Sequence, residues 1–380
     1  MSIKYKEIAS ALRNQILTSE SLVTCKLPTE KELCNTYTAS RQTIRQALSV
    51  LTKEGLIYSK QGSGFYTIPL SSHTEGKVGF LLSEENEYIY PAFISSMRNF
   101  LSAQNITPVI RITDHDYNKE RSILTSLLKQ QPSVLVVEGV RDAFDNPNLD
   151  LYEQLMAQNV SVIFINSEYP SLPQAYHISS DDYMGGYILG EHLIACGQYQ
   201  ISCILPDYAA NARLRYQGML AAFRDHSLQI PSNDIFWYNW NDVKQLRAKQ
   251  NTHFLYSFTH TLRKGNAVFC YNDEIAYHLV KEFEHAQISV PEDIAVVSFD
   301  NSYLSRISSP LLTTLSLGER VLENELTTLI YSLLRQHTTN AVTYQTAITV
   351  HNSVSYNKNI SSHTNMLPWK LISRSSTSTP

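Results

Sequence analysis

The stretch SRQTIRQALSVL, residues 40–51, decides the fold of the amino-terminal part of the chain. Apolar residues recur along it at i, i+3, i+4 and i+7, which predicts a helix whose buried face runs from Ile44 to Leu51. Ser40 is a good N-cap for this helix. An ordinary solvated helix is one interpretation of the opposite face. The other is a DNA-reading face, because residues of the first two turns could reach base edges and phosphates in a major groove: Arg41, Gln42, Thr43 and Arg45.

The sequence before this helix predicts two further helices. Residues 4–17 carry apolar side chains at helical spacing and form the first. Thr29 and Glu32 have the spacing of a capping box, directly after the helix-breaking Pro28, and they start a short second helix. Gly55 is expected to end the third. Together these elements predict a helix-turn-helix.

Two β-rich runs follow and predict a hairpin. They are residues 56–58 and 65–68, with a glycine-bearing segment between them. A hairpin directly after a recognition helix is a wing, and we expect its tip at Gln61 and Gly62 to approach the DNA backbone or minor groove. Residues 1–70 hold nine Lys and Arg against five Asp and Glu, a net charge of +4, whereas the whole chain has −4 and the remainder therefore −8. A basic head on an acidic body is expected when only the head meets a polyanion.

Four motifs in this region resemble the winged helix-turn-helix domain of the GntR family. They are PTE at 28–30, SRQTIRQAL at 40–48, EGLI at 54–57 and GSG at 62–64. Cys34 departs from the family's pattern, which usually has a small residue there. The resemblance implies a DNA-binding domain over residues 1–69. The DNA contacts that we predict come from Lys4, Arg41, Gln42, Thr43, Arg45, Gln61 and Gly62.

The composition changes at a polar, helix-breaking linker, residues 70–76. Beyond it, short β-branched runs alternate with helical stretches, a pattern typical of a parallel, doubly wound sheet buried on both faces. The length of this body predicts two α/β lobes, and such folds bind ligands at the carboxyl ends of their strands. The predicted strands are residues 78–82, 108–112, 134–137, 160–165, 201–205, 267–270 and 294–299.

Polar side chains follow four of these strands. A single carboxylate at a strand end is commonly a helix N-cap, and Asp273, ahead of the helix 274–284, can be that and nothing more. Four polar ends that converge on one cleft instead favour a small-molecule site. Carboxylate and amide acceptors beside an arginine donor suit a polyhydroxylated sugar, because each hydroxyl both donates and accepts. The strand-end residues are Glu138, Asn166, Asn272 with Asp273, and Asp300.

The body resembles the effector domain of the LacI family over residues 77–357. Its motifs are CYNDEIA at 270–276, VPEDIAVVSFDN at 290–301, LTTL at 312–315, D-x-x-x-G-G-x-x-x-x-x-H-L at 181–193 and R-x-x-G at 215–218. Leu317-Gly318 and the segment 202–207 depart from the family's pattern, so the resemblance bears on the class of ligand more than on its identity. The effector contacts that we predict are Tyr88, Glu138, Arg215, Asn272 and Asp300, of which the resemblance implies the last three.

A GntR-type head joined to a LacI-type body is an unusual pairing, and it resembles the bacterial arabinose repressors. The stretches YIYPAFI at 88–94, ER at 120–121 and LVVEG at 135–139 point the same way. The resemblance implies a homodimeric repressor that binds operator DNA and is released by a small sugar, L-arabinose. The alternative is the same type of regulator with another ligand: another pentose, a sugar phosphate or a purine. A sugar phosphate would require more Lys or Arg in the cleft than Arg215 alone.

Other classes of protein find little support. The sequence has no phosphate-cradling glycine loop, nucleophile elbow or metal-spaced His/Glu set, so we expect no catalytic residue, cofactor or metal. A sugar-active enzyme fused to a DNA-binding head is the less favoured alternative. No apolar run approaches the roughly 18 residues of a membrane span, and no signal peptide is evident, which predicts a cytoplasmic protein. Residues 358–380 are rich in Ser and Thr and are predicted to form a disordered tail.

Overall fold

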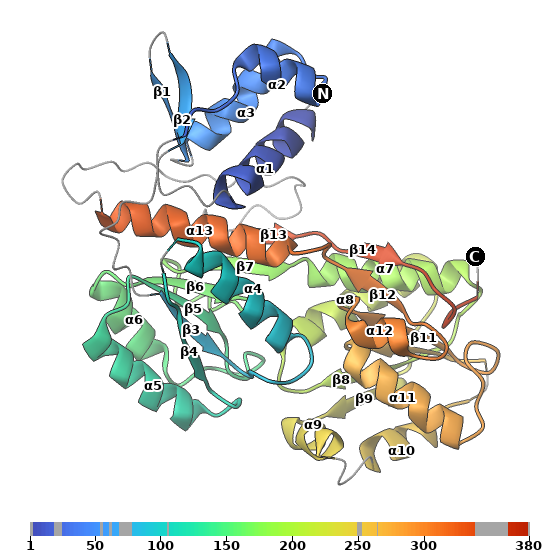
Figure 1. The fold of residues 1–380 in the computed structure, drawn as a ribbon. Helices are drawn as coiled ribbons and strands as arrows, with labels where there is room; N and C mark the ends of the chain where they lie inside the picture. The colour runs from blue at the N-terminus through green and yellow to red at the C-terminus, as the bar shows by residue number, and fades with distance from the viewer. Residues whose placement is uncertain are drawn as a thin grey trace.

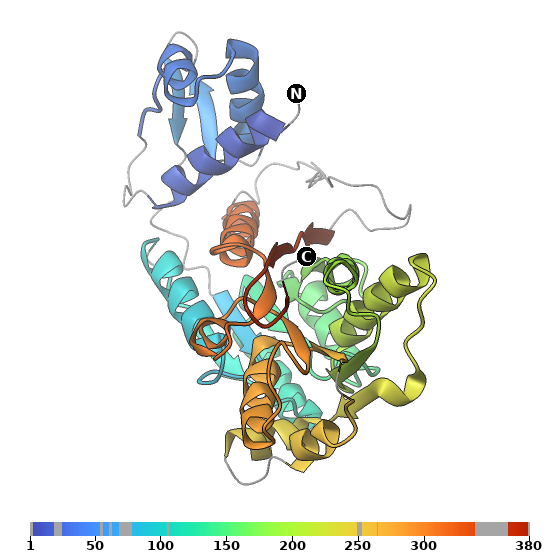
Figure 2. The ribbon, with the colours of Figure 1, turned by 90° about the vertical axis from the view of Figure 1, so that its right-hand side faces the viewer.

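In the computed structural model, the chain forms a small N-terminal head and a two-lobed α/β body (Figures 1 and 2). The structure describes residues 3–18, 25–53, 56–60, 63–67, 78–104, 106–248, 253–263, 265–338 and 364–378. The predicted linker at 70–76, the wing tip at Gln61 and Gly62, and the predicted helix end at Gly55 lie outside these residues. Within them, no helix is long and apolar enough to cross a membrane.

The head consists of three helices and an antiparallel hairpin, as the sequence predicts. The third helix buries its predicted apolar face, from Ile44 to Leu51, against the first helix and the hairpin. The capping box is present: the Thr29 hydroxyl accepts from the Glu32 N–H at 3.3 Å, and the Glu32 carboxylate accepts from the Thr29 N–H at 2.7 Å. The elements are α1 (Ile3–Thr18), α2 (Glu30–Tyr37), α3 (Arg41–Lys53), β1 (Ile57–Lys60) and β2 (Gly64–Thr67).

Lobe 1 of the body contains a six-stranded, wholly parallel sheet with the strand order β13-β7-β6-β5-β3-β4. Its central strands are buried because apolar side chains occupy both faces, under helices on either side (Figure 1). The strands are β3 (Val78–Leu82), β4 (Val109–Ile112), β5 (Val134–Glu138), β6 (Ser161–Ile165), β7 (Tyr176–Ser180) and β13 (Thr364–Leu367). The helices are α4 (Tyr90–Ser102), α5 (Tyr117–Gln130), α6 (Leu149–Ala157) and α13 (Val321–Thr338).

Lobe 2 contains a second six-stranded sheet with the order β14-β12-β11-β10-β8-β9, in which only β14 is antiparallel. The strands are β8 (Ile201–Pro206), β9 (Ile235–Tyr238), β10 (Ala267–Cys270), β11 (Ala295–Phe299), β12 (Thr313–Ser316) and β14 (Lys370–Ile372). The helices are α7 (Asp182–Ala195), α8 (Ala210–Asp225), η1 (Ser232–Asp234), α9 (Trp240–Arg247), α10 (His253–Thr259), α11 (Asp273–His285) and α12 (Tyr303–Ile307).

Helices α7 and α8 pack backbone against backbone. A Cβ atom at Gly218 would lie 1.8 Å from the Tyr183 carbonyl oxygen, and one at Gly186 would lie 1.9 Å from the Arg215 carbonyl oxygen. The G-G and R-x-x-G motifs of the sequence therefore serve this close approach. It fixes the position of Arg215 on α8.

The chain crosses between the lobes three times, from β7 to α7, from β12 to α13 and from β13 to β14. The first and third crossings are joined by a hydrogen bond from the Asp181 N–H to the Leu367 carbonyl oxygen at 2.9 Å. Leu317-Gly318, which depart from the LacI pattern, lie in the second crossing, where Gly318 has φ +99°. The departure thus falls on a connection between the lobes.

The predicted disordered tail is wrong for residues 364–378, and the body does not end at residue 357. β13 joins the sheet of lobe 1, and β14 joins that of lobe 2. Ser and Thr side chains here satisfy buried backbone groups: Ser376 is fully buried, and its hydroxyl donates to the Val296 carbonyl oxygen at 2.6 Å. Local composition missed these strands because their partners lie far away in the sequence.

Candidate functional site

The polar face of α3 is exposed on the head. Arg41, Gln42 and Arg45 are exposed and Thr43 is half-buried. Arg41 and Arg45 both donate through Nε to the Glu30 carboxylate, at 2.6 Å and 3.0 Å. These hydrogen bonds hold the pKa of Glu30 below its ordinary value. Because the bonds use Nε, the terminal nitrogens of both guanidinium groups are the ones that can face a nucleic acid.

The other predicted DNA contacts lie around α3. The Lys4 ammonium donates to the Thr38 carbonyl oxygen at 2.7 Å, which fastens α1 to the turn before α3. In the wing, the Tyr58 and Tyr66 rings stack with centroids 5.7 Å apart. Gln61 and Gly62 stay predictions, since they lie outside the described residues.

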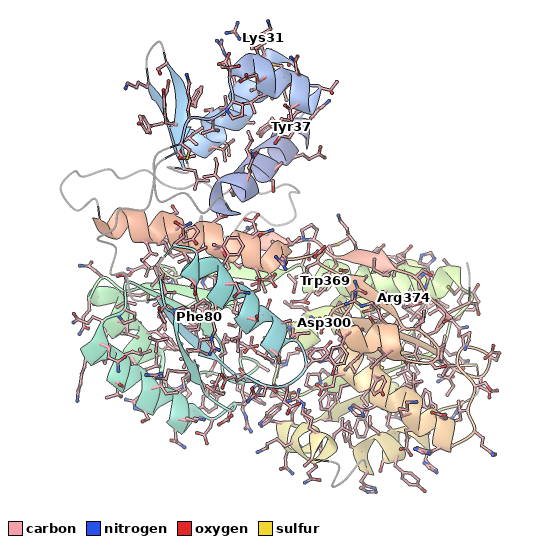
Figure 3. The ribbon with its side chains drawn as sticks, in the orientation of Figure 1. Lys31, Tyr37, Phe80, Asp300, Trp369 and Arg374 are labelled. Atoms are coloured by element: carbon pink, nitrogen blue, oxygen red, sulfur yellow. The ribbon has the colours of Figure 1, made fainter. Side chains whose placement is uncertain are left out.

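In the body, the structure brings strand-end side chains of the two lobes together. Asp300, directly after β11, accepts a hydrogen bond from the Tyr88 hydroxyl at 2.7 Å, and this bond crosses from lobe 2 to lobe 1. Figure 3 shows Asp300 at the junction of the lobes. Burial raises the pKa of Asp300, although the Arg215 guanidinium works against that shift. Asp300 and Tyr88, each predicted separately as an effector contact, therefore meet at the interface between the lobes.

Glu138 ends β5 on the lobe 1 side of the cleft. Its carboxylate accepts from the Tyr90 hydroxyl at 2.7 Å and from the Ser83 N–H at 2.9 Å. Burial, followed by the charge of Glu138, raises the pKa of Tyr90 well above its ordinary value. Tyr90 therefore stays protonated and donates.

Arg215 is 4% exposed and already has protein partners. Its Nε donates to Asp182 at 2.8 Å, its Nη1 donates to the Tyr271 carbonyl oxygen at 2.6 Å, and its guanidinium carbon lies 4.0 Å from the Phe299 ring centroid. Two of its nitrogens are thus committed to the scaffold. A ligand would meet the remaining N–H groups.

Asn272, not Asp273, is the N-cap of α11: its Oδ1 accepts from the Ile275 N–H at 3.0 Å. A ligand contact of Asn272 would therefore use its amide NH2. Asp273 is fully buried and accepts from the hydroxyls of Ser298 and Thr314 and from the Ser302 N–H. Burial, together with Asp300, raises the pKa of Asp273 to about 6. The simple cap considered for Asp273 is wrong.

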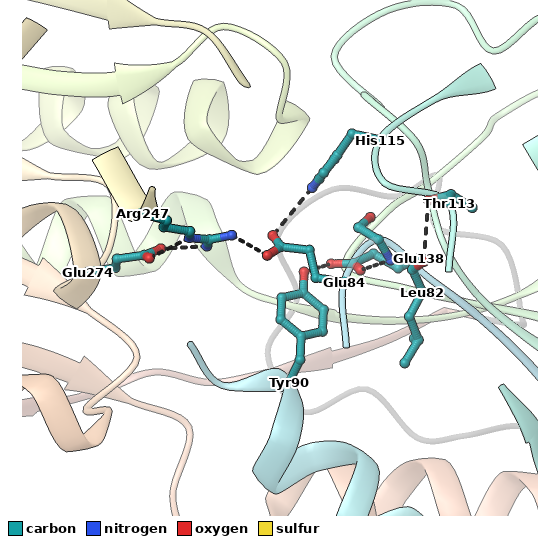
Figure 4. Close-up of polar contacts among 9 residues, drawn as sticks. Leu82, Glu84, Tyr90, Thr113, His115, Glu138, Arg247 and Glu274 are labelled. Atoms are coloured by element: carbon teal, nitrogen blue, oxygen red, sulfur yellow. Dashed lines mark hydrogen bonds and ion pairs between the residues drawn. The ribbon is translucent and has the colours of Figure 1, made fainter. Parts of the chain in front are cut away.

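A second connection across the cleft was not predicted from the sequence (Figure 4). Arg247 of α9 donates to both oxygens of Glu274, at 2.6 Å and 2.7 Å, and its Nη1 donates to Glu84 of lobe 1. His115 lies beside Glu84 and packs against Trp240 with ring centroids 4.0 Å apart. Glu84 and His115 follow β3 and β4 closely, so the same strand-end pattern could have found them.

Several buried polar atoms near these strand ends have no hydrogen-bond partner within the described part of the chain. They are the Ser83 hydroxyl, both ring nitrogens of His115 and the Trp240 Nε1. The 3.5 Å from His115 Nε2 to Glu84 is too long for a good hydrogen bond. Buried polar groups are normally satisfied, so this part of the cleft is suited to a polar ligand or water.

The fold and the site define a class: a DNA-binding head joined to a two-lobed ligand-binding body. Residues 4–67 match the bacterial regulatory proteins of the gntR family, and residues 191–377 match the periplasmic binding protein-like domain. The chain combines a GntR helix-turn-helix domain with a periplasmic-binding-protein-like domain, the organisation of a transcriptional regulator.

Several known proteins resemble the chain over most of its length. It is 29% identical to the arabinose metabolism transcriptional repressor of Halalkalibacterium halodurans over 322 residues, covering 83% of this chain and 85% of the relative. It is 26% identical to a repressor of the same name from Geobacillus stearothermophilus, covering 82% of this chain and 86% of the relative. A periplasmic binding protein/LacI transcriptional regulator from Alkaliphilus metalliredigens, complexed with D-xylulofuranose, matches with a TM-score of 0.61 at 20% identity, covering 80% of this chain and 100% of that one. That likeness establishes the fold of the body.

Proposed function

We propose that this chain represses sugar-utilisation genes and is released from its operator by a neutral sugar, L-arabinose in the first instance. The observation that carries the proposal is the interface between the lobes, where strand-end acceptors of both lobes lie near buried polar atoms that lack partners within the described residues. The names of the relatives and the pentulose in the structural neighbour support the choice of a five-carbon sugar. We propose no enzymatic role and place the protein in the cytoplasm, where operator DNA is.

Within this proposal, the ligand lies between the predicted contacts of the two lobes. Arg215 and the Asn272 amide supply donors, and the carboxylates of Glu138 and Asp300 supply acceptors. Tyr88 closes the cleft opposite Asp300.

The charges of the cleft favour a neutral ligand over a sugar phosphate. Its two arginines are already neutralised, Arg215 by Asp182 and Arg247 by Glu84 and Glu274. Further carboxylates line the cleft at Glu138, Asp142 and Asp300. An anion would be repelled there, whereas sugar hydroxyls can donate to each carboxylate.

We further propose that the protein acts as a homodimer held together by the body. A symmetric dimer would place two heads on a palindromic operator. On lobe 2, three apolar side chains of α12 and the segment after it are exposed: Tyr303 54%, Ile307 59% and Leu311 44%. They offer apolar surface for such an interface. The fragment 1–70 should then be monomeric in sedimentation, and a tight dimer of that fragment would contradict the proposal.

The proposed function is tested by titrating sugars against the full chain in calorimetry and against its operator complex in fluorescence anisotropy. L-arabinose should bind and release the DNA, other pentoses should act more weakly, and pentose phosphates and purines should have no effect. A purine or sugar phosphate that alone releases the DNA would replace the proposed effector.

Asp300→Ala tests the site itself. The variant should bind operator normally but need far more sugar for release, because loss of the carboxylate leaves buried donors unpaired, which costs about 1–3 kcal/mol. Asp225→Ala, an exposed aspartate at the end of α8, is the matched control. Release of the Asp300→Ala complex at the wild-type concentration would place the effector elsewhere.

A further inference from the structure

Side-chain contacts join the two lobes, and one of them involves Asp300, a carboxylate that the proposed effector would use as an acceptor. The Tyr88 hydroxyl of lobe 1 donates to the Asp300 carboxylate of lobe 2 at 2.7 Å. Beside this bond, Glu84 of lobe 1 accepts from Arg247 of lobe 2. Asp300 is thus engaged by a residue of the opposite lobe.

The backbone of Tyr88 is arranged to make this contact. Its φ is +54°, in the left-handed region that a bulky residue rarely adopts. Backbone strain of this kind tends to be held at functional sites. The neighbouring Tyr90 begins α4 and turns instead toward its own lobe. The strained turn therefore directs one tyrosine across the cleft and the other into lobe 1.

A phenol and a sugar hydroxyl present the same group to a carboxylate, an O–H donor on a carbon framework. We infer that the Tyr88 hydroxyl occupies the place of an effector hydroxyl on Asp300 and must be displaced before the effector can bind. This inference rests on the proposed function of the cleft. Tyr88 is then an internal competitor that sets the concentration at which the inducer acts.

Competition by the Tyr88 hydroxyl should change the sugar affinity in one direction only. A ligand shifts an equilibrium only through its differential affinity for the two states, so a bond that the ligand has to break weakens its apparent affinity. Removal of the Tyr88 hydroxyl should therefore tighten sugar binding. A residue that simply contacts the sugar would show the opposite.

The structure supplies a matched control in Tyr90. Its hydroxyl donates to the Glu138 carboxylate, also at 2.7 Å, but both residues belong to lobe 1. Tyr88→Phe and Tyr90→Phe thus each remove one phenol–carboxylate bond of equal length, and only the first bond crosses the cleft. A difference in sugar affinity between the two variants therefore measures the effect of the hydrogen bond that joins the lobes.

The experiment compares wild type, Tyr88→Phe and Tyr90→Phe by calorimetric titration with L-arabinose and by operator release. Tyr88→Phe should bind the sugar about tenfold more tightly and release DNA at correspondingly lower concentration, because a hydrogen bond to a carboxylate contributes about that factor or more. Tyr90→Phe should bind with unchanged or weaker affinity. Equal or weaker binding by Tyr88→Phe would overturn the inference.

A second readout needs no sugar. Urea unfolding constants of ligand-free wild type, Tyr88→Phe, Asp300→Asn and the double variant form a mutant cycle, which should show a coupling of about tenfold between the two side chains. Lack of coupling overturns the inference, whereas lack of sugar binding by wild type with the coupling intact overturns only the proposed effector. If Tyr88→Phe does not fold, Tyr88→Asn removes the phenol and suits the left-handed backbone.

Discussion

The head and the body hold their functional arginines in opposite environments. The side chains of Arg41 and Arg45 in the head are 71% and 61% exposed, whereas those of Arg215 and Arg247 in the cleft are 5% and 15% exposed. All four pair with carboxylates. Water screens the exposed pairs, which can be exchanged for a phosphate at little cost, while the buried pairs are fixed parts of the scaffold. Arginine is thus exposed and available to DNA in the head, whereas in the body it is a buried part of the scaffold.

The largest expected effect comes from breaking a buried pair. Asp182→Ala removes the partner of Arg215 and should destabilise the body by about 3–5 kcal/mol, since it leaves a buried charge uncompensated. Urea unfolding followed by tryptophan fluorescence measures this loss. The control is Glu30→Ala, which frees Arg41 and Arg45 and should cost less than about 1 kcal/mol in the stability of the head. Equal losses of stability in Asp182→Ala and Glu30→Ala would show that the buried and the exposed ion pairs do not differ in strength.

Operator affinity should depend on the exposed arginines of α3. Arg45→Ala should weaken binding by about 1–3 kcal/mol and relax base preference if it reads a base edge, or lower the salt dependence by about one ion if it contacts a phosphate. Arg224→Ala, an exposed arginine of the body, serves as control. Unchanged affinity in both Arg41→Ala and Arg45→Ala would show that α3 does not read the DNA.

The pH dependence of stability should also differ between the body and the head, but by less than the effects above. Asp142 of lobe 1 accepts from the Ala210 N–H at the start of α8 in lobe 2, at 2.9 Å, and burial raises its pKa to about 7. The folded state then binds more protons than the unfolded state between about pH 4 and pH 7, so the stability of the body should fall as pH rises through that range.

Asp142→Asn keeps an acceptor for the Ala210 N–H and removes the titrating group. It should reduce the slope, to which Asp273 also contributes, and stabilise the body at pH 8 by at least about 1.4 kcal/mol, the equivalent of one pKa unit. Denaturation of the fragment 1–70 over the same pH range gives the head's own profile. An Asp142→Asn slope that matches wild type would exclude Asp142 as its source.

The smallest effect concerns the head alone. Thr29→Ala breaks the capping box of α2 and should cost about 1 kcal/mol in the stability of the head, with no change in sugar binding. Thr29→Ser retains a capping hydroxyl and should restore most of that stability. Thermal unfolding of the fragment 1–70 measures both. Equal stability of the Thr29→Ala and wild-type fragments would show that the capping box does not stabilise the head.

The sequence predicts elements whose signals are local. The apolar spacing from Ile44 to Leu51 and the capping residues define the head, and β-branched runs such as Val134–Val137 define the inner strands. Strand β12 escaped prediction because three of its four side chains carry hydroxyls, and Thr314 is buried with a hydrogen bond to Asp273 at 2.7 Å. Such a bond becomes visible only once the tertiary partner is known.

The residues at the interface between the lobes also divide into those that the sequence predicts and those that it does not. Glu138 and Asp300 could be predicted because each follows an apolar strand, and the structure places both at the cleft. The connection from Arg247 to Glu84 joins residues 163 positions apart, and no spacing rule relates them. The resemblance to known families found Arg215, but its pairing with Asp182 emerges only from the packing of α7 against α8.

The position of β13 and β14 after all other described elements has a consequence during synthesis. The ribosome delivers the head first, and neither lobe has its last edge strand until residues 364–372 have been added. A nascent chain can therefore complete its DNA-binding head well before its ligand-binding body. A product cut short before residue 364 would carry every predicted DNA contact and an unfinished sensor. Such a fragment would compete with the intact protein for operators, and the sugar would not release it from the DNA.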